Sequence, residues 1–255
     1  MERINSKHNQ QIKQLKKLAT PKGRKQQQRY LLESWHLVQE ALASLPAAEI
    51  EMIYATDDQD LEHGSELTGW PVTLISDAVA QELGETTTPQ GIFLVCKLQA
   101  PAVEPNYHGA WLLLDQVQDP GNIGTMVRTA DAAGFAGVVF GNGTASPYNG
   151  KVLRAMQGSQ FHLQVVEADL KVVLDWFHTK QRPVYGTELN PAAVNYREVH
   201  PQSDFALIMG NEGNGMDSSL LQQTTKNLYI PIKGHAESLN VAIAAAVIMF
   251  RIKAD

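Results

Sequence analysis

Three loops of this chain carry the side chains that could do chemistry. They span residues 115–124, 210–215 and 231–240, and each follows a short apolar run and precedes a helix-like run. All three are rich in Gly, Asn or acidic residues. In open α/β sheets, ligands bind where loops leave the carboxyl ends of the strands. The pattern therefore predicts that the three loops form one composite pocket.

The first loop has the residues of an anion-binding helix start. Pro120-Gly121 indicates a turn, and Asn122 is a candidate cap for the following helix. The free amides of a helix start attract anions. Arg128, less than two turns into that helix, could grip a phosphate through two hydrogen bonds. A plainer interpretation is an exposed Arg128 paired with Asp131 on the helix surface, and the loop alone leaves both open.

The other two loops are equally ambiguous when taken singly. Three glycines around Glu212 allow close backbone approach. Glu212 could orient Arg128 or accept a hydrogen bond from a hydroxyl, or simply be a solvated side chain in a tight turn. Ser238 and Asn240 stand before the apolar run 241–250, where they could cap a buried helix and still face a ligand.

Several other kinds of site are not indicated. There is no phosphate-loop Gly-Lys-Ser/Thr sequence, no complete dinucleotide fingerprint and no Gly-x-Ser-x-Gly nucleophile elbow. The eight histidines lack metal-ligand spacing and the chain has one cysteine, so we expect no metal site. A nucleotide-dependent oxidoreductase is therefore disfavoured.

Composition indicates a globular protein with an uneven charge. The 255 residues are 44% hydrophobic and 19% charged. The single Cys96 lies in an apolar run, which predicts a buried structural thiol in a reducing compartment. No signal-peptide core and no membrane-length apolar stretch occur, so we expect a cytoplasmic protein. Residues 1–30 hold nine of the 21 Lys and Arg residues but one of the 27 acids, which indicates either a polyanion-binding arm or a solvated tail.

The periodicity predicts two α/β domains that would position these loops. A long amphipathic helix is expected over 27–45, ended by Pro46. Around it, a small domain over 1–98 should contain strands at 50–55, 72–75 and 91–97, with helices at 57–67 and 76–83. A proline-containing linker is expected at 99–109. In the domain at 110–255, the alternation predicts a mainly parallel sheet with helices on both faces. Its strands are expected at 111–114, 138–140, 161–166, 183–187, 205–209 and 228–230, and its helices at 122–133, 148–156, 169–179, 217–224 and 239–252.

In order and spacing, the three loops resemble the motifs of the SpoU (TrmH-type) RNA ribose methyltransferases of the SPOUT superfamily. The matching segments are Asp115…Asp119-Pro-Gly-Asn-Ile-Gly124…Arg128-Thr-Ala130, Ile208-Met-Gly-Asn-Glu-Gly213 and Ile230-Pro231…Gly234…Ser238-Leu-Asn240. A further family segment matches Lys151-Val-Leu-Arg-Ala155. The front of the chain is similar to the N-terminal substrate-binding domain of many members, with Ser34 where the family usually has Gly.

The resemblance implies a fold, a cofactor and partners. It implies a catalytic domain with a deep trefoil knot, S-adenosylmethionine as cofactor, RNA as substrate and a homodimer. The active-site positions would be Arg128, Asn122, Glu212, Ser238 and Asn240, and the cofactor positions Thr187, Gly210, Ile230 and Leu239. The residues expected to contact RNA are Lys7, Lys16, Lys17, Arg24, Lys25 and Arg154.

The resulting hypothesis is a 2′-O-ribose methyltransferase acting on structured RNA, with rRNA favoured over tRNA by analogy. A ribose hydroxyl is a weak nucleophile whose proton must leave in or near the transition state. Since a guanidinium stays protonated, we expect Arg128 to clamp a phosphate and stabilise the developing alkoxide, with Ser238 or the phosphate relaying the proton. The alternative is an RNA-binding protein of the same fold without turnover.

Overall fold

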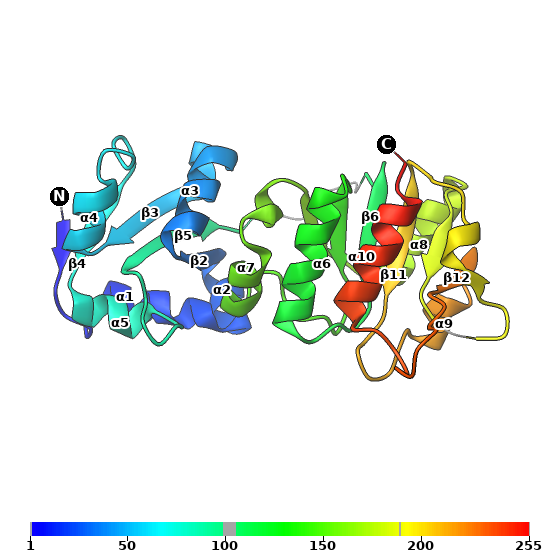
Figure 1. Ribbon diagram of the computed structural model, residues 1–255. Helices are drawn as coiled ribbons and strands as arrows, with labels where there is room; N and C mark the ends of the chain where they lie inside the picture. The colour runs from blue at the N-terminus through cyan, green and yellow to red at the C-terminus, as the bar shows by residue number, and fades with distance from the viewer. Residues whose placement is uncertain (1, 99–105, 189, 255) are drawn as a thin grey trace. The chain divides into compact units, whose positions relative to one another are not determined.

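The chain forms two units (Figure 1). The computed structural model describes residues 2–98, 106–188 and 190–254. The first unit contains residues 2–98 and the later segment Tyr148–Phe161, and the second contains 106–147 and 162–254. The linker predicted at 99–109 lies largely outside the described residues.

The first unit is a five-stranded sheet with helices around it. The strand order is β1 (Glu2–Ile4), β4 (Val72–Ile75), β3 (Ile50–Ala55), β5 (Ile92–Lys97) and β2 (Arg29–Glu33). Strands β1, β4 and β3 are parallel, and β5 runs antiparallel to both β3 and β2. Cys96 is fully buried in β5, and this burial raises the pKa of its thiol to about 12, which fits a structural role. The helices are α1 (Gln10–Lys16), α2 (Pro21–Gln27), α3 (Trp35–Ser44), α4 (Asp57–His63), α5 (Asp77–Leu83) and α7 (Gly150–Met156).

The single helix predicted over 27–45 is wrong. The chain instead forms strand β2 and then α3, because residues 29–33 pair along their whole length with β5. Positive φ angles at Gln28 (53°) and Ser34 (108°) interrupt the helix on either side of the strand. Ser34 therefore adopts a backbone conformation that favours Gly, the residue the family usually has there.

The basic N-terminal segment is part of the folded unit. It forms β1, α1, the 3-10 turn η1 (Lys17–Ala19) and α2, and β1 pairs with β4. The apolar residues Ile12, Leu15 and Leu18 of this segment lie in the core with Phe93. The segment is therefore not a solvated tail, and its binding to a polyanion stays a prediction.

The second unit contains a seven-stranded sheet in which every pairing is parallel, as predicted. Its order is β10 (Val194–Asn195), β12 (Lys226–Tyr229), β9 (Val184–Gly186), β11 (Phe205–Met209), β6 (Ala110–Leu114), β7 (Gly137–Phe140) and β8 (Gln164–Glu167). Trp111, Phe177 and Ile208 are among the buried side chains of its core. The helices are α6 (Pro120–Ala132), α8 (Leu170–Thr179), α9 (Ser218–Leu221) and α10 (Val241–Ile252).

The sheet order brings the three loops to one edge. Strand β11 lies between β6 and β9, and β12 lies beside β9. Because all these strands are parallel, the loops that follow β6, β11 and β12 leave from the same edge of the sheet. Helix α10 packs beside α6 (Figure 1). The α/β class is confirmed, and the trefoil knot stays a prediction of the resemblance.

Among the described residues, no helix has the length and apolar character needed to cross a membrane.

Candidate functional site

A chain of side-chain hydrogen bonds joins the three loops. The amide nitrogen Nδ2 of Asn240 donates to Oδ1 of Asn122 at 2.9 Å, and Nδ2 of Asn122 donates to Oε1 of Glu212 at 3.1 Å. These residues are up to 118 positions apart in the sequence. Three of the five predicted active-site residues are therefore in direct contact.

The way α6 begins leaves the Asn122 side chain available for these bonds. The prediction that Asn122 caps this helix is wrong, because the helix begins at Pro120 and Asp119 is its cap. Oδ1 of Asp119 accepts the backbone N–H of Asn122 at 2.7 Å. Proline suits the first position of a helix because its missing N–H would have no partner there. Asn240, in contrast, does cap α10, since its Oδ1 accepts from Ala242 and Ile243.

Glu212 is held by the first loop. Its carboxylate accepts from the backbone amides of Gln118 at 3.4 Å and Asp119 at 3.3 Å, as well as from the Asn122 side chain. Partial burial by itself raises the pKa of this carboxyl, but these hydrogen bonds outweigh it and hold the pKa of Glu212 below its usual value. Glu212 therefore stays ionised and fastens the second loop to the first, and no hydrogen bond or ion pair joins it to Arg128.

Asn211 stabilises the second loop, both through the first loop and within the second loop itself. Asn211 donates through Nδ2 to the carbonyl of Gln116 at 2.8 Å, and its Oδ1 accepts from the amides of Gly213 and Asn214. A Cβ at Gly210 would lie 2.5 Å from the carbonyl carbon of Gly215, so only glycine fits where the loop closes on itself.

Arg128 is exposed on α6 and makes no hydrogen bond or ion pair with any described residue. The alternative pairing with Asp131 does not occur, because Oδ2 of Asp131 lies 3.2 Å from Nδ1 of His162. An exposed planar cation that no described residue binds is suited to bind a phosphate through two hydrogen bonds.

A cavity of about 480 Å³ lies beside the third loop and the start of α10. Four of the predicted residues line it, namely Thr187, Ile230, Ser238 and Leu239, whereas Gly210 is not part of its lining. Thr187 is fixed in place, since its hydroxyl donates to the carbonyl of Ile208 at 2.8 Å. Sequence reasoning missed the remaining lining residues, although most are sequence neighbours of predicted ones. They are Glu188, Leu228, Tyr229, Pro231, Ile232, Glu237, Ala244 and Ile248.

The cavity fits S-adenosylmethionine in size and chemistry. Pockets for ligands of this size have volumes of about 300–1,000 Å³. Apolar side chains such as Leu228 and Ile248 suit a purine ring and a methionine side chain. Two carboxylates, Glu188 and Glu237, suit a ligand that carries positive charge.

The residues predicted to contact RNA fall into two groups. Lys7, Lys17 and Lys25 are exposed. Lys16 instead pairs with Glu82 and thereby lowers the pKa of that carboxyl.

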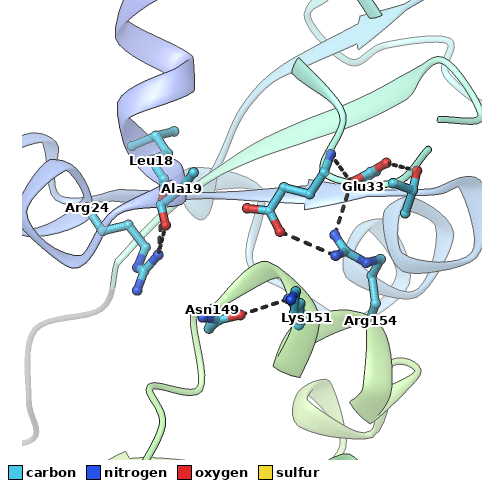
Figure 2. A network of polar contacts seen from close by, with 9 residues as sticks. Leu18, Ala19, Arg24, Glu33, Asn149, Lys151 and Arg154 are labelled. Carbon is cyan, nitrogen blue, oxygen red and sulfur yellow. Dashed lines mark hydrogen bonds and ion pairs between the residues drawn. The ribbon is translucent and has the colours of Figure 1, made fainter. Parts of the chain in front are cut away.

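Arg24 and Arg154 are both bound by the protein itself, and Figure 2 shows their contacts. Arg24 is 4% exposed and donates to the carbonyls of Leu18 at 3.0 Å and Ala19 at 3.2 Å. Arg154 on α7 donates to Glu33 at 3.0 Å and to Glu85 at 3.3 Å. These contacts give both arginines structural roles in the first unit.

Comparisons with known proteins agree with this geometry. Residues 109–250 match the SpoU rRNA Methylase family, and residues 9–94 match the MRM3-like substrate binding domain. The chain is 44% identical to the 23S rRNA (guanosine(2553)-2′-O)-methyltransferase RlmP of Bacillus subtilis (strain 168), over 99% of this chain and 100% of the relative.

Two solved structures are similar over nearly the whole chain. An AdoMet-bound rRNA methyltransferase from Sinorhizobium meliloti has a TM-score of 0.86 at 27% identity, covering 98% of this chain and 97% of its own. A putative RNA methyltransferase of the TrmH family from Porphyromonas gingivalis has a TM-score of 0.84 at 31% identity, covering 95% and 96%. With its motif loops joined and its length matched from end to end, the chain belongs to the SpoU rRNA methylase family.

Proposed function

We propose that this protein transfers the methyl group of S-adenosylmethionine to a ribose 2′-hydroxyl of 23S rRNA. The target is the guanosine equivalent to the one named for its Bacillus relative. As a member of the SpoU family it is an S-adenosylmethionine-dependent RNA methyltransferase. The observation that carries the choice of target is the 44% identity to the Bacillus enzyme over 99% of this chain. The Asn240–Asn122–Glu212 chain of hydrogen bonds, which joins three loops beside a cavity of cofactor size, supports the location of the reaction centre.

The third loop and the start of α10 hold the cofactor in this proposal. Thr187, Ile230, Ser238 and Leu239 line the cavity that would enclose it. The cofactor supplies an activated methyl group, and the protein aligns the acceptor oxygen with it. Alignment of this kind can lower the activation barrier by about 7–11 kcal/mol. Gly210 contributes by letting the second loop close tightly on itself.

Arg128 binds the RNA in this proposal. Its open guanidinium grips a phosphate next to the target ribose and stabilises the negative charge that develops on the 2′-oxygen. The exposed hydroxyl of Ser238 or the phosphate itself relays the leaving proton to solvent. Asn122 and Glu212 keep the first loop, and with it the start of α6, in place.

The first unit binds the RNA outside the reaction centre. The match of residues 9–94 to a substrate-binding domain and the exposed Lys7, Lys17 and Lys25 support this assignment. The buried Cys96 agrees with a reducing compartment, and we place the protein in the cytoplasm.

The protein acts as a homodimer in this proposal. On α10, Ile243 and Phe250 are 52% and 63% exposed. They lie seven residues apart and thus on one face of the helix. A second copy that covers this face would remove the exposed apolar surface from water. Phe250→Glu should then shift the mass measured by light scattering from dimer to monomer, and an unchanged dimer mass would refute this surface as the interface.

The test of the function is methyl transfer from tritiated S-adenosylmethionine to total RNA of a strain that lacks this gene. The expected product is a single 2′-O-methylguanosine in 23S rRNA, mapped by its block to reverse transcription at low nucleotide concentration. Label on a base would refute the 2′-O assignment. Cofactor binding without label in any RNA would favour an RNA-binding protein without turnover.

A further inference from the structure

The cavity beside the third loop is lined by two carboxylates. Glu188 follows β9 and Glu237 lies in the third loop, and both line the cavity. None of the described residues that line it is Lys, Arg or His. Glu188 is half-buried and Glu237 is exposed, and two negative charges at one cavity favour a ligand that is positive.

Glu188 is placed where it can act on a ligand. Its side chain is half-buried, and its Oε2 would lie 3.7 Å from a Cβ at Gly215, so the carboxylate extends from β9 towards the second loop. It makes no hydrogen bond or ion pair with a described residue. The surrounding lining is largely apolar, which strengthens a charge interaction relative to bulk water.

The reaction changes the charge of the cofactor by one unit. The ribose oxygen forms a new bond to the methyl carbon as the bond from that carbon to sulfur breaks, and the electron pair of the broken bond stays on sulfur. The hydroxyl proton passes to solvent. S-adenosylmethionine carries a positive sulfonium, whereas S-adenosylhomocysteine has a neutral thioether. The two molecules share the adenine, the ribose and the amino-acid end, so only the sulfonium distinguishes them by charge.

We propose that Glu188 and Glu237 make this cavity select the sulfonium cation, so that it favours S-adenosylmethionine and releases the neutral product. The proposal rests on the assignment of the cavity as the cofactor site. An alternative role for the carboxylates, as acceptors for the ribose hydroxyls, would act on substrate and product equally.

The test is calorimetric binding of three probes to Glu188→Gln, Glu237→Gln and the double variant. The probes are S-adenosylmethionine, S-adenosylhomocysteine and sinefungin, which carries an amine in place of the sulfonium methyl group. Charge interactions across a partly exposed site predict that each variant weakens S-adenosylmethionine and sinefungin about three- to tenfold and S-adenosylhomocysteine less than about twofold. Raising the salt concentration should reduce the preference of the wild type for S-adenosylmethionine over S-adenosylhomocysteine, because salt screens the charge interaction.

The matched control is Glu167→Gln. Glu167 is exposed on β8, at the opposite edge of the same sheet, and does not line the cavity. Its substitution removes the same charge from the protein. It should leave all three affinities unchanged.

Three outcomes would overturn the proposal. Equal weakening of both natural ligands would show that the carboxylates bind a part they share, and unchanged affinities would show that they do not face the ligand. If the wild type bound neither ligand, the cofactor assignment of the cavity would be wrong, and this inference would fall with it.

Discussion

In the first unit, half of the side chains predicted to contact RNA are held by the protein itself. In the second unit, by contrast, the Arg128 side chain makes no hydrogen bond or ion pair with any described residue. Arg24 donates to two carbonyls, and Arg154 and Lys16 pair with carboxylates. Arg128 lies on the surface of α6, and Asp131, three positions further along the chain, contacts His162 instead.

This difference separates cations that stabilise the fold from cations that are available to bind a ligand. Arg128 and Arg154 both lie in segments that resemble the family, and both are arginines on helices. Glu33, the partner of Arg154, is 7% exposed and also accepts from Glu85 N and the Thr86 hydroxyl. A charge enclosed in such a network is committed to structure, while an exposed one without a partner is available for substrate.

The largest effect should come from Arg128→Ala. Removing a group that stabilises developing charge typically lowers turnover about 10²–10³-fold. We expect that loss in single-turnover methyl transfer at saturating RNA, with unchanged S-adenosylmethionine affinity. Arg128→Lys should recover only part of the rate because Lys lacks the paired donors. Near-normal turnover of the Ala variant would show that this open cation is not catalytic.

Arg154→Ala should instead affect stability. It leaves the buried Glu33 without its cation, and breaking a buried pair costs about 3 kcal/mol. Urea unfolding should report this loss in the free energy of unfolding, while Lys151→Ala, an exposed cation on the same helix, should change it little. Weaker RNA binding at unchanged stability would return Arg154 to the RNA-binding group.

The exposed lysines allow a direct comparison within the first unit. The double variant Lys17→Ala/Lys25→Ala should weaken RNA binding and reduce the salt dependence of log K by about 2, one unit for each phosphate contact. Lys16→Ala is the control, because Lys16 is already paired with Glu82. Filter binding across a salt series would measure both. Equal slopes for all variants would mean that these lysines do not contact phosphates.

Glu212 is a charged group of the second unit that the protein itself holds, and the effect of replacing it should be the smallest. Because its folded pKa is lowered, its contribution to stability is complete above the unfolded value near 4.5 and is lost as the pH falls through the folded value. The free energy of unfolding of Glu212→Gln should therefore approach that of the wild type as the pH is lowered from about 6 to 3. The difference at pH 7 should be below about 1 kcal/mol, since the side chain is exposed. If the difference in free energy of unfolding between the wild type and Glu212→Gln grew as the pH fell, the hydrogen bonds would not stabilise the ionised carboxylate of Glu212.

Much of the fold followed from local signals. The strands predicted at 50–55, 72–75 and 205–209 have those bounds in the structure, because each is a short, mainly apolar run. The helix predicted over 27–45 failed because residues 29–33 have a spacing that suits a helix face, and only pairing with β5 made them a strand. Long-range pairing overrides local periodicity of this kind.

The site was predictable in its residues but not in its contacts. The order of the motifs pointed to Asn122, Glu212 and Asn240, yet not to the hydrogen bonds among them, since these join positions far apart in the chain. Glu188 and Glu237 carried no motif signal of their own. A carboxylate next to a cavity is recognisable only when the cavity walls are known.

The sequence by itself determined the alternating α/β pattern, the loops at the ends of strands and the residue types that their chemistry needs. These depend on side-chain periodicity and on residue types that neighbours along the chain can specify. Tertiary structure alone decided that Arg128 is open while Arg154 is paired with Glu33, 121 residues away. The energy of a charge pair depends on the distance between the two groups in space. That distance is set only when the chain has packed, so the residue types alone do not reveal it.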